Sequence, residues 1–320
     1  MCYGFDGEAA LRRSLVDRRS LLRGSAAAVA GVGLAAGLGS TGAAAHDKQD
    51  THDRHPGHRH VPPGLISMQL WTMRDALSGQ PGYDETLRQL ARIGYPRVEL
   101  ALGYFGRTAE QLRRFFDDIG IKATSSHDGI SETPAALAEK IRNARILGQS
   151  FMVVPYLYSE KTDDWKRWAE QMNTEAAAAR RAGLRYGYHN HAHEFTIDLG
   201  GGKRPWDVLT AELDPKLVHL EVDLYWVVTG GINSGDGVAD PEGFAIDVIR
   251  RARQRVLQYH VKDRHAADGD MADLGTGMID FRRIFRAHRV LEYIVENDTP
   301  DVTPRRTAEI GYRYLRTLRY

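Results

Sequence analysis

The chain has 320 residues, of which 42% are apolar and 27% charged, the composition of a globular protein with one large domain or two small ones. Its formal net charge is +1 and it has no basic block, which opposes binding to a nucleic-acid backbone. The single cysteine, Cys2, excludes a disulfide framework and leaves His, Asp and Glu as metal ligands.

Residues 1–45 have the features of a twin-arginine export signal. Arg18 and Arg19 precede a weakly hydrophobic run of Gly and Ala, and residues 43–45 (AAA) offer a cleavage site. The run is less apolar than the roughly 20-residue stretch of a membrane helix, so we expect no stable membrane anchor. Cleavage before His46 would remove five arginines and three acids and change the formal charge to −1. We predict an exported protein, periplasmic or extracellular.

Residues 46–63 contain five histidines among polar residues and prolines. Such a stretch can bind metal loosely. We interpret it as a solvated His/Pro-rich linker that leads to a folded domain over 64–320.

From residue 64 onwards, short apolar runs alternate with amphipathic stretches. The runs predict eight strands, at 65–71, 97–102, 121–127, 150–156, 185–191, 218–226, 256–263 and 292–298. Apolar residues at three- and four-residue spacing predict helices between many of them, among them 83–94, 108–120, 136–148 and 165–183. Eight β/α units over this length predict a single-domain α/β fold, a (β/α)8 TIM barrel. An open doubly wound sheet is the alternative, but the first strand runs into "WTMRDAL" and not into a Gly-rich loop.

Polar side chains follow nearly every predicted strand. Because active sites of such barrels lie where the strands end, we expect these side chains to converge. Period-two alternation places Gly187, His189 and His191 on one face of a strand, and His219, Glu221 and Asp223 on one face of the next.

Five motifs, "YHNHAHEF", "EVDLYW", "YHVKD", "GTGMIDF" and "IVEND", occur in this order. Together they resemble the sugar phosphate isomerase/epimerase family with the xylose isomerase-like barrel, from about residue 65 to the end. The resemblance implies a divalent metal held at the barrel mouth, with Asp223, His260 and Glu296 as ligands. Many relatives have a glutamate ligand where this chain has Gly187, so His189 is expected to be either the replacement ligand or a catalytic base.

The remaining polar residues are assigned by their position. Glu296 and His189 are the candidate bases, and Lys262 is a further catalytic candidate that protonates or orients oxygens. We expect Glu99, His127, His191 and Trp226 to contact substrate, with loop structure as the alternative for His191 and core packing as the alternative for Trp226. His193 and Glu194 either contact substrate or shape their loop, and each strand-end carboxylate can instead be a helix cap or an ion-pair partner.

A histidine with carboxylates suits Mn²⁺, Mg²⁺, Co²⁺ or Zn²⁺. Such an ion stabilises the enediolate formed when a proton leaves the carbon beside a carbonyl, a step common to isomerisation, epimerisation and dehydration. We predict a metal-dependent isomerase or epimerase of a free or oxidised small carbohydrate, with a lyase or hydratase of a keto-sugar as the alternative. A nuclease resembling endonuclease four and a noncatalytic sugar-binding barrel are less favoured, and no nucleic-acid partner is expected.

Overall fold

The computed structural model describes residues 59–320 except Asp236. Its centre is a parallel sheet of eight short, mostly buried strands. They are β1 (Ile66–Gln69), β2 (Arg97–Leu100), β3 (Lys122–Ser126), β4 (Phe151–Val154), β5 (Arg185–His189), β6 (Val218–Asp223), β7 (Val256–Val261) and β10 (Glu292–Val295).

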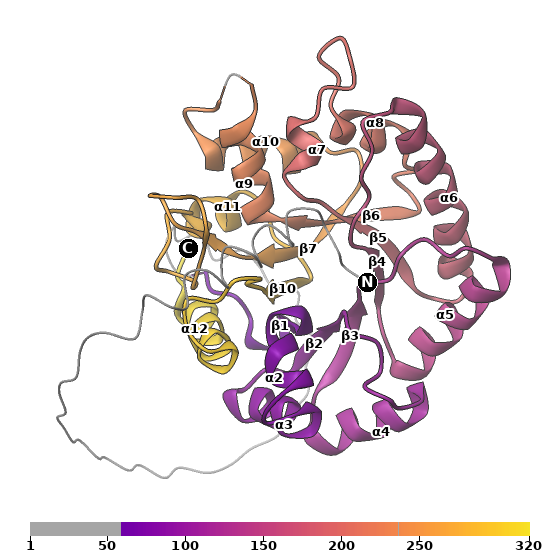
Figure 1. The fold of residues 1–320 in the computed structure, drawn as a ribbon, viewed down its shortest axis with the longest axis vertical. Helices are drawn as coiled ribbons and strands as arrows, with labels where there is room; N and C mark the ends of the chain where they lie inside the picture. Colours follow the sequence, from indigo (N-terminus) through magenta and orange to yellow (C-terminus); the bar gives the residue numbers. More distant parts are fainter. Residues whose placement is uncertain (1–58, 236) are drawn as a thin grey trace, which may run out of the picture.

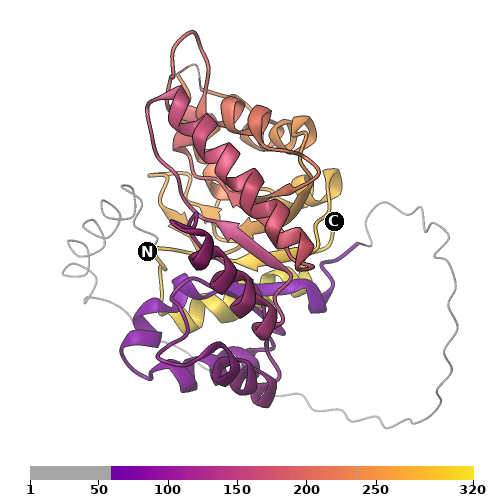
Figure 2. The same ribbon diagram turned by 90° about the vertical axis from the view of Figure 1, so that its right-hand side faces the viewer.

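The strands lie side by side in the order β3-β2-β1-β10-β7-β6-β5-β4. A parallel bridge between His127 and Val153 joins the two ends of this order, so the sheet closes on itself. Helices surround the strands (Figure 1), and Figure 2 shows the same arrangement from the side. The predicted single-domain TIM barrel is confirmed.

The helices begin and end within a few residues of the predicted positions. Gly94, Gly120 and Gly148 end three of them with positive φ angles of 113°, 72° and 73°, which glycine adopts without strain. The helices are α2 (Arg74–Ser78), α3 (Tyr83–Ile93), α4 (Ala109–Ile119), α5 (Pro134–Leu147), α6 (Thr162–Arg181), α7 (His193–Thr196), α8 (Pro205–Glu212), α9 (Leu224–Asn233), α10 (Pro241–Arg251), α11 (Phe281–Ala287) and α12 (Pro304–Thr317). No helix of the described residues is long and apolar enough to span a membrane.

All eight predicted strands extend one to three residues beyond the observed carboxyl ends, and the run at 218–226 shows why. The run at 218–226 is a strand only as far as Asp223, and Tyr225 and Trp226 lie in the first turn of α9. The physical reason is a helix cap, because Asp223 Oδ1 accepts a hydrogen bond from Trp226 N at 2.9 Å.

The "GTGMIDF" motif (275–281) folds around one carboxylate. Asp263, in the short hairpin of β8 (Asp263–Arg264) and β9 (Met271–Ala272), accepts hydrogen bonds from the backbone N–H groups of Gly275, Gly277 and Ile279 at 3.0–3.2 Å. A Cβ on Gly277 would lie 2.2 Å from Asp263 Oδ1, so glycine is required there. The motif therefore builds the loop that follows β7.

The signal predicted over 1–45 and most of the linker predicted over 46–63 lie outside the described residues. Within the rest of that linker, Arg59 and Tyr320 exchange two backbone hydrogen bonds of 3.1 and 2.9 Å. Val61 is fully buried. The folded unit therefore includes residues 59–63, and its first and last residues lie together.

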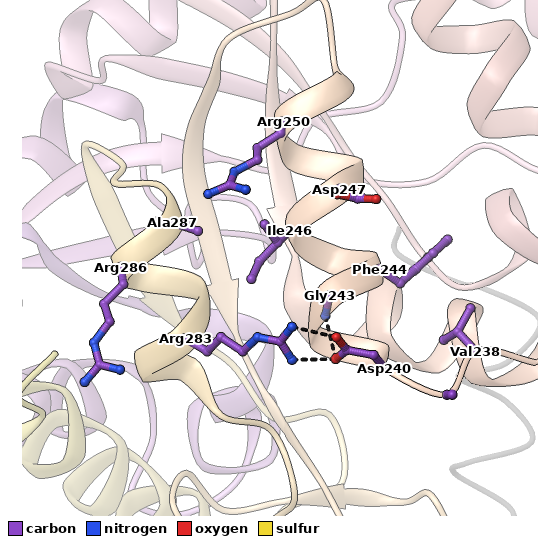
Figure 3. Close-up of a pocket in the computed structure, with 11 residues that line it drawn as sticks. Val238, Asp240, Gly243, Phe244, Ile246, Asp247, Arg250, Arg283, Arg286 and Ala287 are labelled. Carbon is purple, nitrogen blue, oxygen red and sulfur yellow. Dashed lines mark hydrogen bonds and ion pairs between the residues drawn. The ribbon is translucent and has the colours of Figure 1, made fainter.

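A surface groove lies between α10 and α11. An ion pair between Asp240 and Arg283 crosses it, and Arg250 and Arg286 also line it (Figure 3). None of the site residues predicted from the sequence is in its lining.

Candidate functional site

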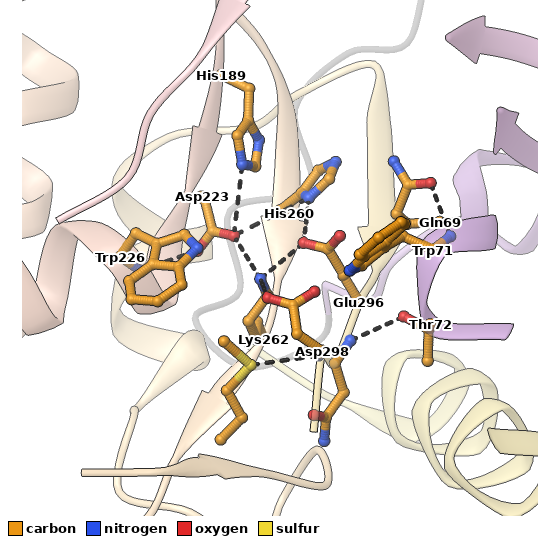
Figure 4. Close-up of polar contacts among 12 residues, drawn as sticks. Gln69, Trp71, Thr72, His189, Asp223, Trp226, His260, Lys262, Glu296 and Asp298 are labelled. Atoms are coloured by element: carbon orange, nitrogen blue, oxygen red, sulfur yellow. Dashed lines mark hydrogen bonds and ion pairs between the residues drawn. The ribbon is translucent and has the colours of Figure 1, made fainter. Parts of the chain in front are cut away.

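The barrel brings the predicted ligands together at the carboxyl ends of four strands. His189 ends β5, Asp223 ends β6, His260 lies in β7 and Glu296 directly follows β10. One ligand atom from each of the four falls within 4.8 Å of the others. His260 Nδ1 lies 2.8 Å from Glu296 Oε2 and 3.9 Å from Asp223 Oδ2, and His189 Nε2 lies 4.0 Å from Asp223 Oδ2 (Figure 4). We call these four residues the outer group.

Lys262 lies beside the outer group with its side chain almost fully buried. Its Nζ is 2.7 Å from Glu296 Oε2, 3.2 Å from Asp223 Oδ2 and 3.0 Å from Asp298 Oδ2. Burial alone would lower the pKa of Lys262, but these three carboxylates raise it well above its ordinary value. The residue is therefore a fixed cation that holds the carboxylates in place.

Beneath the outer group lies a second polar layer that includes Glu99, His127 and Glu221. Glu221 Oε1 is 2.8 Å from His127 Nε2 and 3.1 Å from His260 Nε2. Glu99 Oε1 is 2.7 Å from His260 Nε2 and accepts a hydrogen bond from Gln69 Nε2 at 2.6 Å. His127, His189, Glu221 and His260 form a second set whose ligand atoms lie within 4.8 Å of one another.

Burial and neighbouring charges shift the pKa values of these groups in opposite directions. Burial, with the nearby His260, lowers the pKa of His189 to about 3, so its imidazole is neutral at pH 7. Burial raises the pKa of Asp223 to about 6 against the opposing effect of Lys262. Burial would also raise the pKa of Glu296, but Lys262 and His260 lower it well below its ordinary value. His189 and Glu296 thus have the protonation that a cation requires of its ligands. His260 differs, because burial would lower its pKa but Glu221, Glu296 and Glu99 raise it well above its ordinary value, so this ring must release a proton when it binds a cation.

The mouth above the cluster is aromatic. Trp226 and Trp71 lie on opposite sides of the group formed by His260, Glu296 and Lys262 (Figure 4). Lys262 Nζ lies 5.3 Å from the centroid of the Trp226 ring, and the ring of His191 also lies 5.3 Å from Trp226. Of the residues predicted to contact substrate, Trp226 and His191 are therefore at the mouth, whereas Glu99 and His127 lie in the deeper layer.

The missing glutamate at Gly187 has a steric explanation. A Cβ built on Gly187 would lie 2.5 Å from both Cε1 and Nε2 of His219, so the His219 ring fills the space that a side chain at 187 would need. His219 Nε2 is in turn 2.9 Å from Gln258 Oε1. The inward position on β5 that remains near the outer group is His189.

His193 and Glu194 support their loop. Glu194 is fully buried, and it accepts hydrogen bonds from Tyr188 Oη at 2.6 Å and from His191 N at 2.9 Å. His193 Nε2 lies 2.7 Å from Leu157 O. Of the two interpretations that the sequence left open, the contacts favour loop structure.

Two residues of the cluster had no role assigned from the sequence. Glu221 shares a strand face with Asp223, and that alternation was the available signal. Asp298 lies at the end of "IVEND", two residues beyond Glu296, and nothing in the sequence separates it from an ordinary loop acid. Its contact with Lys262 depends on how the segment turns after β10.

The model of the xylose isomerase-like TIM barrel family matches residues 87–318. The chain belongs to this family. The resemblance noted in the sequence is thereby confirmed. No functionally curated protein matches the chain.

Solved structures of sugar-modifying enzymes share the xylose isomerase-like barrel of this chain. A sugar phosphate isomerase/epimerase from Parabacteroides distasonis has 25% identity and a TM-score of 0.61, covering 79% of this chain and 94% of its own. A second one from the same organism has 22% identity and a TM-score of 0.64, with 79% and 98% covered. The 3-keto-D-glucoside 4-epimerase of E. coli has 15% identity and a TM-score of 0.56, with 79% and 99% covered.

The outer group of this xylose isomerase-like barrel fits a divalent cation. Asp223 Oδ2 is buried and makes no hydrogen bond, although Lys262 Nζ is near it. The carboxylates of Asp223, Glu296 and Asp298 surround the ammonium group of Lys262. Those of Glu99 and Glu221 lie against His260 Nε2, so carboxylates outnumber the ammonium group of the cluster. Imidazole and carboxylate donors suit Zn²⁺, Mn²⁺, Co²⁺ or Mg²⁺.

Proposed function

We propose that the protein is a divalent metal-dependent isomerase or epimerase of a free or oxidised carbohydrate. The observation that carries the proposal is the outer group, in which one imidazole or carboxylate atom from each of four strand ends lies within 4.8 Å of the others. His189, Asp223, His260 and Glu296 would hold the ion. When bound, a divalent ion polarises a carbonyl and stabilises the negative charge that develops as a proton leaves the neighbouring carbon.

Glu296 is the residue proposed to move that proton. Its side chain is the most exposed of the outer group, at 6% for the residue against 0–2% for the other three, so it faces the mouth from which a substrate enters. Lys262 and His260 contact Oε2 and hold the carboxylate in one orientation. A carboxylate fixed at the mouth can accept a proton from a bound sugar and return it on the same face to the neighbouring carbon, as isomerisation requires. Epimerisation additionally needs a proton donor on the opposite face of the sugar.

The mouth favours a neutral sugar over a phosphorylated one. Lys262 is held by three carboxylates. Arg74 donates hydrogen bonds to the backbone oxygens of Trp71 and Asp298 at 3.0 and 2.6 Å. Both cations beside the cluster are thus engaged, whereas the Trp71 and Trp226 rings offer apolar walls of the kind that pack against sugar rings.

Metal content and solvent exchange test the proposal together. After metal loading and desalting, the wild-type protein should retain about one equivalent, and Asp223→Ala and His260→Ala should lose it. Asp240→Ala, which breaks the ion pair of the surface groove, is the matched control and should retain it. Incubation of the loaded protein with free and 3-oxidised sugars in heavy water should exchange a carbon-bound proton.

The outcomes separate the alternatives. Exchange with isomeric products supports an isomerase or epimerase, and loss of water from the sugar would assign the lyase instead. His189→Ala should lose metal and turnover together if His189 is a ligand, whereas retained metal with turnover lowered by about 10²- to 10⁴-fold would make it the base. Full metal retention by both Asp223→Ala and His260→Ala would refute the site.

We also propose that residues 1–45 direct export through the twin-arginine route, on the strength of Arg18, Arg19 and the run that follows. Replacing both arginines by lysine should leave the precursor in the cytoplasm. Unchanged export of that variant would indicate another route.

A further inference from the structure

Basic side chains surround the rim of the barrel at which the strands begin. Six of the eight strands have a lysine or arginine at their first residue or within the three residues before it. These side chains are Arg97, Lys122, Arg185, Lys216, Arg255 and Arg289, and we call them the basic ring. Because parallel strands of a closed barrel all begin at one rim, these residues share one face of the molecule although they are far apart in the sequence.

The charges of the basic ring are accessible and are not paired with acids. Five of the six residues are exposed, Arg97 is partly buried, and none of the six makes an ion pair with a described residue. Arg97 and Lys122 are direct partners in the pairing of β2 with β3. Arg97 Nη1 lies 3.4 Å from Leu291 O, and the Arg185 guanidinium lies 5.3 Å from the centroid of the Phe151 ring. Neither contact neutralises the positive charge.

Local acids and helix ends do not account for the basic ring. In the described segments that lead from a helix into a strand, the acids are Asp214 and Glu292. Asp214 accepts a hydrogen bond from Lys216 N, and Glu292 is buried inside the barrel against Thr124 and Gln258. Each member of the ring lies two to four residues beyond the end of the preceding helix, whereas a helix dipole acts within the last turn.

The rim at the mouth has the opposite charge. The loops that follow the strands contain the carboxylates of the outer group and further acids, among them Asp128, Asp268, Asp270 and Asp301. The whole chain is nearly neutral, so its positive and negative charges are separated along the barrel axis. A negatively charged surface would attract the basic ring and repel the mouth, and this would orient the barrel.

We propose that the basic ring docks the barrel reversibly onto an anionic lipid surface, with the mouth facing the solvent. Charges arranged around one rim fit a flat surface, whereas a nucleic acid or an acidic polysaccharide is a chain that a row of charges would follow. Leu291 is 41% exposed beside Arg97 and offers an apolar side chain to the headgroup layer. The inference does not depend on the proposed function.

Sedimentation with lipid vesicles measures this binding. The full chain should sediment with vesicles of equimolar phosphatidylglycerol and phosphatidylcholine but not with vesicles of phosphatidylcholine alone. Added salt should release it, because salt screens exposed charges. One variant combines Lys216→Gln, Arg255→Gln and Arg289→Gln, whose side chains make no hydrogen bond or ion pair with described residues. Each basic residue near an anionic surface contributes about 5-fold to binding, so this variant should bind about 10- to 100-fold more weakly.

The matched control removes the same charge from the opposite rim. It combines Lys161→Gln, Lys203→Gln and Arg305→Gln, three exposed residues at or just before the starts of α6, α8 and α12, and it should bind like the wild type. A third variant, Lys216→Arg with Arg255→Lys and Arg289→Lys, keeps the charge and should also bind like the wild type. Residues 1–58 are the same in all these proteins, so differences in binding report the basic ring. Circular dichroism checks that each variant is folded.

Two results would overturn the proposal. The first is equal binding by the basic-ring variant and its matched control, or no binding of the wild type to the phosphatidylglycerol vesicles. The second is stronger binding of the wild type to polygalacturonate or duplex DNA than to the vesicles, because this would assign the basic ring to a polyanionic chain.

Discussion

Glu292 should make the stability of this protein fall between about pH 5 and pH 8. The residue begins β10 and is fully buried, with one carboxyl oxygen bonded to Thr124 Oγ1 and the other accepting a hydrogen bond from Gln258 Nε2 at 3.2 Å. Burial raises the pKa of Glu292 from 4.5 to about 7. Because the folded-state pKa is the higher one, the native protein keeps a proton that the unfolded chain releases.

The magnitude follows from the two pKa values. The difference between 4.5 and about 7 corresponds to roughly 3 kcal/mol of unfolding free energy. This stabilisation is fully present below pH 4.5 and is lost as the pH rises through about 7. Glu292→Gln is neutral at every pH, so from low to high pH its stability relative to the wild type should rise by up to roughly 3 kcal/mol.

Urea unfolding of both metal-free proteins at about pH 5 and pH 8 measures this change. Groups that titrate alike in the two proteins cancel in the comparison, which isolates Glu292. Glu170→Gln, at an exposed position on α6, should follow the wild type at both pH values. If the stability difference between Glu292→Gln and the wild type is the same at both pH values, the buried carboxyl is ionised throughout and the reasoning is wrong.

Three further predictions concern packing, the loop after β5 and the metal. Gly187→Ala should destabilise the fold by about 1–3 kcal/mol because the new methyl group overlaps the His219 ring. In a double-mutant cycle, His219→Ala should relieve part of this loss, and additive changes in the free energy of unfolding would show that the two residues are not in contact. Tyr188→Phe should lower the free energy of unfolding by about 1–3 kcal/mol because it removes a donor from buried Glu194, and a change near zero would show that the bond contributes nothing. A divalent ion at a concentration of about 100 times its Kd should raise the free energy of unfolding by about 2.7 kcal/mol. EDTA should therefore lower the melting temperature, and identical melting temperatures with and without EDTA would count against a bound ion.

The convergence of the outer group could be predicted from the sequence because parallel strands in a closed barrel end at one rim. Asp223 ends β6, His260 is the penultimate residue of β7 and Glu296 follows β10, so the period of the strands and the family motifs were enough to place them together. The end of β6 was misjudged because Tyr225 and Trp226 have strand-like composition, whereas a cap from Asp223 turns them into a helix.

Contacts across the barrel could not be predicted in this way. Alternation puts Glu221 on the face of Asp223, but it does not say that one of its oxygens meets imidazoles from three other segments of the chain. The relation between Gly187 and His219 likewise depends on the register of β5 against β6, which pairs these two residues directly. Such contacts depend on strand register and side-chain volume across the barrel, and neither can be inferred from the spacing of residues in the sequence.

The Asp223 side chain has two roles, because Oδ1 caps the N-terminus of α9 and Oδ2 belongs to the outer group. The helix that it begins carries Trp226, one of the aromatic walls of the mouth. A substitution at position 223 therefore changes the candidate metal site and the mouth together. A longer side chain at position 223 would displace Trp226 together with the carboxylate of the outer group. Substitutions at position 226 leave the Asp223 carboxylate in place. A directed-evolution library should therefore randomise position 226 and hold position 223 constant.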